Sequence, residues 1–551
     1  MKYSILILFI AFIGVKTQAQ TTVKYWLTLT DKNNSEFTID NPSEFLSQRA
    51  IDRRNRYNIE ITTEDLPVNL SYIQQIKDLG LEVLHPSKWF NAVAVKVPIS
   101  QLNLIAEAMA LPFVNDTIKL AYASSKKTQI DKFAKIETEN IDVISNRIYG
   151  EALNQIAMCN GQHLHFNGYD GSGMHIAVMD AGFGEVDELD VFSHLYENNL
   201  LLGTYDFVDL DENVYHGSSH GTNVLSIMTG RYQYQFKGTC PNAHYWLFKT
   251  EDVNSEQRIE EVNWAVAAEK ADSAGVDLIN TSLGYSNFDF PEFTYSYEDM
   301  DGNTTIITRA ADIAASKGMM IVNSAGNSGN STWQYITAPA DGDDVLTVGA
   351  VNQDANYASF SSQGPTFDGR IKPDVCGMGQ GTILLNTNGE VEGGNGTSFS
   401  SPLIAGLVAS FWQATRQFNN QQVMQAIRES ASRFDNPNHT LGYGIPNFVK
   451  AYENLTGQNL IMLENAETLN SIDNKNNPFN ANYYFSETDN TISIELYNTA
   501  GQLINISKKI VKAYQYLNID YSYLKSSLTS GIYILKIQNG EQSNSLKILV
   551  P

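Results

Sequence analysis

Short apolar runs alternate with stretches of helical hydrophobic spacing through the middle of the chain. The runs stand at residues 176–179, 245–248, 276–279, 319–322 and 345–348. Strands that are apolar on both faces are typical of parallel sheets covered by helices on both sides. The pattern therefore predicts an α/β domain over residues 149–455, with a doubly wound, mostly parallel sheet. Ligand sites in such domains lie beyond the carboxyl ends of the strands.

A different pattern precedes this domain, over residues 20–120. It combines a basic helical stretch, Ser47 to Arg56, and a second helix, Tyr72 to Leu79, with an alternating strand, Ala92 to Val97. These elements predict a small α+β unit. The polar residues 121–148 that follow are rich in Lys and Ser and have weak periodicity, so we interpret them as a linker.

Alternation and turns replace the helical spacing toward the C-terminus, after a second linker at 456–476. Within residues 477–551, apolar and polar residues alternate over 492–496 before a turn at Ala500-Gly501. Asn539-Gly540 indicates a second hairpin. The tail is therefore predicted to be a small antiparallel β-sandwich.

The first residues have the composition of an export signal. Lys2 precedes an apolar run from Ile5 to Val15, and Thr17 and Ala19 place small residues where a signal peptidase cuts. Residues 1–19 are therefore predicted to be a signal peptide, and the alternative is an uncleaved N-terminal membrane anchor. No later stretch approaches the roughly 18 uninterrupted apolar residues of a spanning helix. We expect a mature protein without a membrane span, secreted or at the cell surface.

Charge and cysteine content narrow the classes of partner and scaffold. The 551 residues include 37 basic and 61 acidic side chains, a net charge of −24. A surface that neutralises the phosphates of nucleic acid is therefore excluded. Three cysteines, Cys159, Cys240 and Cys376, are too few for a disulfide scaffold.

Three polar residues stand where an α/β domain places functional groups. Asp180 ends an apolar run, His220 opens a stretch of helical spacing, and Ser398 precedes the apolar helix that begins near Pro402. Each also has an ordinary structural explanation: a turn cap, a packed or surface histidine, and a helix N-cap. Because all three lie at strand ends or helix starts of one domain, the sequence favours a shared site.

Two small-residue segments follow other strands of the domain. Ser324-Ala-Gly-Asn327 comes after the run at 319–322, and Ser282-Leu-Gly284 ends the strand that begins near Asp277. An Asn beside a Gly is often turn chemistry alone. Small residues at a strand end, however, leave backbone groups that can pair with an extended peptide.

The residues around these positions resemble the subtilisin-like serine protease family. The shared motifs are Ala-Val-Met-Asp-Ala-Gly at 177–182, His-Gly-Thr at 220–222, Ser-Ala-Gly-Asn at 324–327 and Gly-Thr-Ser-Phe-Ser-Ser-Pro at 396–402. The resemblance covers roughly residues 150–455. It implies hydrolysis of peptide bonds in polypeptide substrates by an Asp-His-Ser triad and an acyl-enzyme intermediate. Ala181 and Asn223 depart from residues often found in the family, but neither belongs to the triad.

The resemblance also implies a role for each candidate residue. Ser398 would be the nucleophile, His220 the general base and acid, and Asp180 the group that orients the imidazole. The Asn327 side chain and the Ser398 backbone N–H would form the oxyanion hole. The residues expected to line the substrate cleft are Ser282, Leu283, Gly284, Ala325 and Gly326.

The flanking units resemble known companions of this family. Residues 20–120 resemble its chaperone-inhibitor prodomain, and the alternative is a permanent N-terminal binding module. Residues 477–551 resemble the C-terminal sorting domain of type IX secretion, and the alternative is a carbohydrate-binding or structural β-sandwich. The implied partners are polypeptide substrates, the chain's own prodomain as an intramolecular inhibitor, and the type IX machinery that exports proteins across the outer membrane.

Two other functions are alternatives to a serine protease. A metalloprotease could use His216 and His220, but Gly217 stands where such enzymes need a Glu. A catalytically inactive homologue could act as a surface binding module, although competent residues fill all four catalytic positions. No cofactor is required. Calcium is a common structural ion in the family, and the acidic loops at 206–212 and 341–344 could supply oxygen ligands, but no residue is assigned to a metal.

Overall fold

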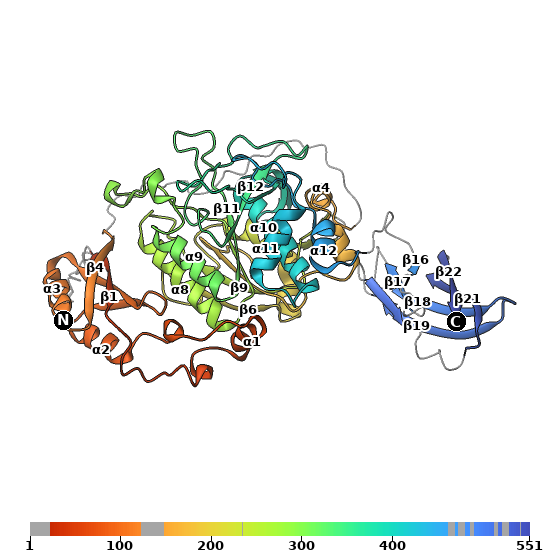
Figure 1. Ribbon diagram of the computed structural model, residues 1–551, viewed down its shortest axis with the longest axis horizontal. Coiled ribbons are helices and arrows are strands. Elements are labelled where there is room, and N and C mark those ends of the chain that lie inside the picture. Colours follow the sequence, from red (N-terminus) through yellow and green to blue (C-terminus); the bar gives the residue numbers. More distant parts are fainter. Residues whose placement is uncertain are drawn as a thin grey trace, which may run out of the picture.

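The chain folds into three successive parts, drawn in sequence colours in Figure 1: an N-terminal unit (22–122), a central domain (148–460) and a tail (469–550). The computed structural model describes residues 22–122, 148–233, 235–460, 469–471, 480–484, 490–511, 516–520, 528–539 and 542–550. The predicted signal peptide, 1–19, lies outside these residues, as does most of the first predicted linker.

A seven-stranded sheet organises the central domain. Its order is β13-β12-β11-β10-β5-β9-β6, and every neighbouring pair is parallel. The predicted doubly wound α/β fold is confirmed. The strands are β5 (His175–Asp180), β6 (Leu201–Asp206), β9 (His244–Lys249), β10 (Leu278–Thr281), β11 (Met320–Ser324), β12 (Val345–Val351) and β13 (Val375–Met378).

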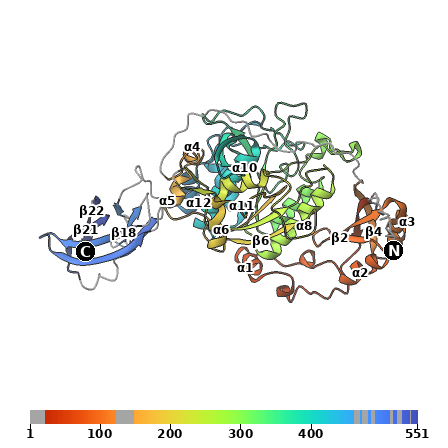
Figure 2. The same ribbon diagram turned by 180° about the vertical axis from the view of Figure 1, so that it is seen from behind.

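Helices cover both faces of this sheet, so alternate residues of each strand enter different cores (Figure 2). Ile176 and Val178 of β5 pack with the core beneath α7 and α10, whereas Ala177 and Met179 pack beneath α8 and α9. Burial on both faces explains why the strands read as continuous apolar runs. The main helices are α7 (His220–Thr229), α8 (Ile259–Ala274), α9 (Ile306–Ser316), α10 (Thr397–Ala414), α11 (Asn420–Ser430) and α12 (Phe448–Thr456).

Shorter elements complete the central domain. An antiparallel hairpin of β14 (Gln380–Leu385) and β15 (Val391–Asn395) leads into α10, and β7 (Arg231–Tyr232) pairs with β8 (Phe236–Lys237). The short helices are α4 (Leu153–Ala157), α5 (Gln162–Phe166) and α6 (Ser193–Glu197). The three cysteines are buried and none forms a disulfide, so packing holds this domain together.

The N-terminal unit is an antiparallel sheet of order β2-β3-β1-β4 with three helices. Trp26 and Ala94 on one sheet face share a core with Ile259 and Val262 of α8. The opposite face forms the unit's own apolar core. The elements are β1 (Thr22–Leu29), α1 (Gln48–Tyr57), α2 (Leu70–Asp78), β2 (Glu82–Ser87), β3 (Ala92–Pro98), α3 (Asn103–Met109) and β4 (Val114–Ala121).

The described part of the tail consists of two antiparallel sheets. One has the order β19-β18-β21-β22 and buries Ile494, Leu496 and Leu535, and the other has the order β16-β17-β20. The predicted turn at Ala500-Gly501 joins β18 to β19. The strands are β16 (Leu469–Ser471), β17 (Asn480–Tyr484), β18 (Asn490–Asn498), β19 (Leu503–Val511), β20 (Tyr516–Asp520), β21 (Gly531–Asn539) and β22 (Gln542–Val550).

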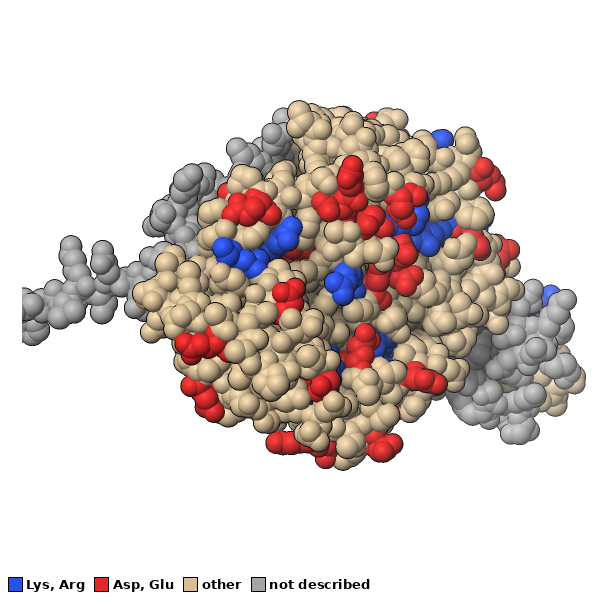
Figure 3. All heavy atoms as spheres, turned by 60° about the vertical axis from the view of Figure 1, so that its left-hand side comes forward, with Lys and Arg blue, Asp and Glu red and all other residues tan. Residues whose placement is uncertain are grey.

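Acidic side chains are spread over the face drawn in Figure 3, with the basic ones among them, as the net charge of −24 requires. Several other acids are buried, and Glu261 is one of them. Glu261 of α8 accepts a hydrogen bond from the Tyr295 hydroxyl at 2.8 Å and one from the backbone N–H of Ile307, in the first turn of α9, at 3.4 Å. Burial raises the pKa of Glu261 to about 7.

This raised pKa predicts a pH-dependent stability. Because the folded state holds the proton of Glu261 more tightly than the unfolded chain does, stability falls as the pH rises from about 4.3 toward 7. Glu261→Gln should therefore raise the melting temperature by a few degrees at pH 8 and leave it almost unchanged at pH 5. Glu298→Gln, at an exposed position nearby, is the matched control. Equal effects of Glu261→Gln at both pH values would contradict the prediction.

Candidate functional site

The site begins at the carboxyl end of β5, where Asp180 is completely buried. Oδ1 and Oδ2 of Asp180 lie 2.9 and 3.0 Å from Nδ1 of His220, and Oδ1 also accepts the backbone N–H of Ala181 at 2.8 Å. The Asp180 carbonyl in turn accepts the N–H of Thr250, which follows β9. The backbone of Asp180 is thus held by the neighbouring strand, and its carboxylate faces one ring nitrogen.

His220 is the first residue of α7 and is almost fully buried. Its backbone N–H donates to the Ser218 hydroxyl at 3.1 Å. The next residue must be glycine: a Cβ on Gly221 would lie 2.3 Å from the Gly182 carbonyl oxygen and 3.0 Å from Cβ of Asp180. Gly221 therefore lets α7 approach β5 closely enough for the imidazole to reach the carboxylate.

Ser398 is the second residue of α10, at the N-terminus of a helix that packs against the centre of the sheet. Its hydroxyl donates to the Ser282 carbonyl at 3.4 Å, and its carbonyl accepts the Ser282 hydroxyl at 2.9 Å. The helix start directs unsatisfied N–H groups and the positive end of the dipole toward this point. An anion that formed beside Ser398 would be stabilised there.

Asn327 lies beyond the end of β11 with an exposed side chain. Its Oδ1 accepts two hydrogen bonds from Thr397, one from the backbone N–H at 2.8 Å and one from the hydroxyl at 3.0 Å. Because both bonds use the oxygen, the amide is oriented and its NH₂ group remains the outward donor. A residue that served only a turn would not need this bridge to the serine helix.

The five residues expected to line a cleft lie on two neighbouring segments. Ser282 to Gly284 follow β10, and Ala325 and Gly326 follow β11. Glycine is required on both: a Cβ on Gly284 would come within 2.1 Å of the Thr337 hydroxyl, and one on Gly326 within 3.0 Å. The structure thus gathers all nine predicted residues at the carboxyl edge of β5, β10 and β11.

Sequence reasoning missed Thr397 and Thr337 as supporting residues. Thr397 orients Asn327, and its hydroxyl also accepts the N–H of Gly326 at 3.1 Å, so one side chain joins three parts of the site. Its only signal was its place beside Ser398. Thr337 fills the space that Gly284 and Gly326 leave open. The sequence around Thr337 gives no indication of this role, because the residues that it contacts are distant in the chain.

The acidic loops proposed for calcium already have protein partners. Asp206 is bound by the Lys249 ammonium at 2.6 Å and by backbone N–H groups of its own loop. Asp341 accepts the Thr308 hydroxyl at 2.6 Å and the Gly302 N–H at 2.9 Å. Structural calcium at these loops stays a prediction, and we derive no step through a metal.

The two-histidine alternative is not supported by the geometry. Nδ1 of His220 faces Asp180, whereas Nε2 of His216 lies 3.6 Å from Asp206. Each histidine thus has a carboxylate partner of its own. Gly217 between them has a positive φ of 89° and marks a turn before α7 rather than a shared helical face.

Comparison with known proteins identifies all three parts. Residues 171–444 match the Subtilase family, residues 24–137 match the propeptide domain of this peptidase family in Bacteroidota, and residues 477–551 match a secretion system C-terminal sorting domain. The central domain therefore belongs to the subtilase family. The resemblances seen in the sequence are confirmed for the central domain, the N-terminal unit and the tail, and a tail of this kind implies secretion.

Two curated relatives agree with this assignment. The chain is 30% identical over 275 residues to a thermophilic serine proteinase of Bacillus sp. (strain AK1), covering 50% of this chain and 60% of that protein. It is also 30% identical over 288 residues to subtilisin E of Bacillus subtilis, covering 51% and 66% of the two proteins. The crystal structure of MycP1 from the ESX-1 type VII secretion system aligns with a TM-score of 0.44 at 20% identity, over 59% of this chain and 90% of that one.

The chain thus spans well under the full length of these two curated relatives, 60% and 66%. Within the described residues, no helix combines the length and apolar composition that a membrane span needs.

The close approach at Gly221 gives a test of the site's geometry. Gly221→Ala should push α7 away from β5 and lengthen the Asp180–His220 contact, because the added Cβ overlaps a backbone carbonyl. The downfield proton NMR signal of a carboxylate-bound Nδ1–H should then be lost. Gly184→Ala, whose Cβ would meet nothing closer than 3.7 Å, should retain it. An unchanged signal in Gly221→Ala would contradict the described packing.

Proposed function

We propose that the chain is a secreted serine endopeptidase that hydrolyses peptide bonds in proteins through Asp180, His220 and Ser398. The observation that carries the proposal is the buried Asp180–His220 pair, 2.9 Å apart, at the same strand edge as a serine on a helix N-terminus. Membership of the subtilase family supports it. The chemistry follows from what each side chain can accept or donate.

His220 is the proton carrier in this proposal. With Asp180 as acceptor, Nδ1 holds the proton and Nε2 presents a lone pair. Nε2 takes the hydroxyl proton as Ser398 Oγ attacks the carbonyl carbon, and it then gives that proton to the leaving amine. The buried carboxylate stabilises the imidazolium that forms in between. Water repeats the sequence on the acyl-enzyme and releases the acid product.

The oxyanion formed in each step needs two donors. The Asn327 side chain supplies one through Nδ2, because Oδ1 is engaged by Thr397. The backbone N–H of Ser398, at the start of α10, supplies the other. Donors held in advance need no reorganisation when charge develops, and this is why such groups stabilise the transition state more than the substrate.

The substrate is an extended polypeptide in this account. Gly284 is exposed, and Gly326 is partly exposed beside it, so backbone groups of both segments are available for strand-like pairing. Peptides bound in this way are recognised through main-chain hydrogen bonds, and pockets for alternate side chains add specificity. No preference for one side chain before the cut bond is assigned.

The flanking parts restrict when and where this activity appears. The N-terminal unit is proposed to act as an intramolecular inhibitor: its last described residue, Tyr122, bonds to Gln257 and stacks on Phe293, which shares a core with Leu283 of the expected cleft. The predicted signal peptide would export the chain, and the tail would deliver it to the type IX machinery. Proteolysis would then begin outside the cell.

Loss of the nucleophile tests the reaction class. Ser398→Ala should abolish hydrolysis of a fluorogenic peptide or of casein and leave the melting temperature within a few degrees, because one oxygen is removed from a helix start. The activity is measured on protein freed of its N-terminal unit. Turnover comparable to that of wild type would refute the triad.

Asn327 separates the oxyanion role from a turn role. Asn327→Ala should lower kcat by roughly 10²–10³, the loss known for the corresponding amide donor in subtilisin, with little change in KM. Asn327→Asp should be worse, since it sets a negative charge where negative charge develops. If Asn327 served only a turn, Asp would be the milder change. An Asp variant more active than the Ala variant would therefore end the oxyanion assignment.

A further inference from the structure

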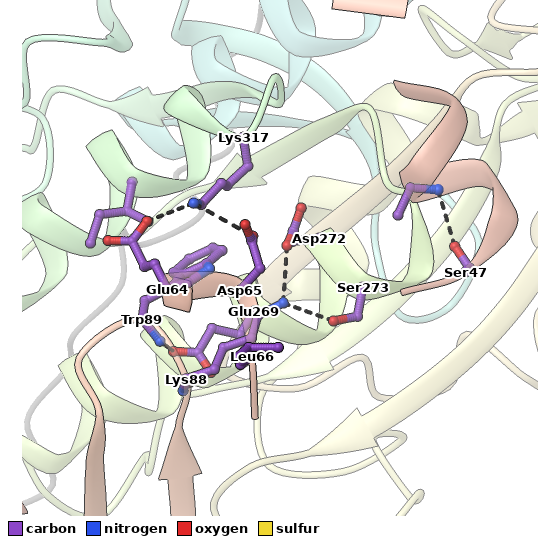
Figure 4. Close-up of polar contacts among 12 residues, drawn as sticks. Ser47, Glu64, Asp65, Leu66, Lys88, Trp89, Glu269, Asp272, Ser273 and Lys317 are labelled. Carbon is purple, nitrogen blue, oxygen red and sulfur yellow. Dashed lines mark hydrogen bonds and ion pairs between the residues drawn. The ribbon is translucent and has the colours of Figure 1, made fainter. Parts of the chain in front are cut away.

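An arm of the N-terminal unit contacts the central domain at a second place. The chain between β1 and α2 leaves the small sheet, and α1 within it lies against the ends of α8 and α9 (Figures 1 and 4). The Lys32 ammonium holds the end of this arm beside the small sheet. It donates hydrogen bonds to the carbonyls of Thr63, Leu66 and Lys88 at 2.7–2.9 Å. The Ser47 backbone N–H donates to the Ser273 carbonyl at 2.9 Å.

Three arginine side chains of α1 form hydrogen bonds and ion pairs with residues of the central domain. Arg53 donates to Asp272, to the Val276 carbonyl and, at 3.1 Å, to the Lys317 carbonyl. Arg54 donates to the same Lys317 carbonyl at 2.6 Å and to Asp272 at 3.1 Å. Arg49 donates to the Gly275 carbonyl at 2.9 Å and pairs with Asp277.

These acceptors are the natural partners of cations. Gly275 and Lys317 are the C-caps of α8 and α9, so their carbonyls and their neighbours belong to helix C-termini. The last carbonyls of a helix lack intrahelical donors, and the helix dipole places negative charge there. Guanidinium groups, with five fixed donors, satisfy several such carbonyls and a carboxylate at once.

Asp272 depends on the N-terminal unit for its charge partners. Within the described residues its ion pairs are with Arg53, Arg54 and Lys88, and all three belong to that unit. Asp272 is fully buried, and both arginines are no more than 2% exposed. Burial alone would raise the pKa of Asp272, but Lys88, Arg54 and Arg53 hold it below its ordinary value. The carboxylate therefore stays ionised in mildly acidic solution.

This surface is separate from the candidate cleft. Asp272 lies just before β10 at the amino edge of the sheet, and Ser282 lies just after β10 at the carboxyl edge. Four strand residues rise by about 13 Å in total. Contacts of α1 are thus made across the sheet from Ser398, whereas Tyr122 of the same unit lies at the cleft side.

We propose that α1 is a second anchor of the N-terminal unit, which keeps that unit bound to the central domain after the chain between them has been cut. The partner of the acidic surface at Asp272 and Asp277 is an arginine-bearing helix of the same chain. The α1 contacts named above are all made to described residues outside 123–147, so a cut in that segment leaves them in place. This proposal rests on the proposed function only in assuming that the chain is cut. The test makes that cut without any peptidase activity of this protein.

The test uses the full chain with Ser398→Ala, so that no autolysis occurs. A recognition sequence for an unrelated, site-specific endopeptidase is inserted within residues 123–147, and the N-terminal unit carries a fluorescent label. After cutting, the protein is diluted strongly so that a released unit does not rebind, and gel filtration follows the release of the label with time. The wild-type anchor should keep both pieces in one peak for hours.

Two variants weaken the anchor to different degrees. Arg53→Lys with Arg54→Lys retains both charges but loses the forked bonds to Asp272 and the helix carbonyls, and should release the unit about 100-fold faster. Arg49→Ala is milder, because Asp277 keeps Arg416 at 2.9 Å and the His175 N–H, and should release it roughly 10-fold faster. Arg56→Ala, an exposed position on the same helix, is the matched control and should not change the rate.

The outcomes are distinct. A wild-type pair that separates as soon as the chain is cut would overturn the proposal, and so would release from both anchor variants at the wild-type rate. Thermal melts of the uncut variants check folding. If the double variant fails to fold, Arg49→Ala decides alone, since its partner remains paired. Failure of the anchor would leave the proposed peptidase activity untouched, because no step of this experiment measures hydrolysis.

Discussion

The hydrogen bond between Asp180 and His220 is the contact on which the candidate site depends. It joins the carboxyl end of β5 to the first residue of α7, and two glycines make this close approach possible. Gly221 must be glycine for the helix to come close, and Gly182 must be glycine because a Cβ there would lie 2.0 Å from the His216 carbonyl. The sheet supplies the remaining geometry, since β10 and β11 end at the same edge and deliver Ser282 and Asn327 beside the start of α10.

The two edges of the sheet hold charge in different ways. Around Asp180 and Asn327, at the carboxyl edge, the donors include neutral groups such as the N–H of Ala181 and the hydroxyl of Thr397. At the amino edge the carboxylate of Asp272 is paired with guanidinium and ammonium groups of the N-terminal unit. Removing the partners of a buried carboxylate costs far more than losing an exposed pair. The N-terminal unit spans both edges, so we expect its departure to require two separate events.

Local patterns of the sequence predicted the positions of the site residues well. Apolar runs indicated buried strands, and the polar residue after each run then had to lie at the strand edge. Helix starts at His220 and Ser398 could be predicted because apolar residues with helical spacing follow each of them. The sequence also indicated a basic helix near Ser47 to Arg56, which is α1. It could not indicate where the arginines bind, because Asp272 and Asp277 lie more than 200 residues further along the chain and show no pattern of their own.

Contacts across the fold were likewise invisible in the sequence. Nothing local in the acidic loop at 206–212, for example, indicated that Lys249 at the end of the neighbouring strand would pair with Asp206. Thr397 looks like an ordinary helix-start residue until Asn327 is brought against it. Residues of this kind are defined by strand order, which hydrophobic periodicity alone does not fix.

The central claim is that Ser398 is the nucleophile of a serine peptidase, and covalent labelling tests it most directly. The protein is freed of its N-terminal unit, treated with a fluorophosphonate, and mapped by peptide mass spectrometry. A nucleophilic Ser398 should be the one labelled residue, with no label in the Ser398→Ala protein or after acid denaturation. Labelling at another serine, or its absence from folded protein that carries Ser398, would contradict the account.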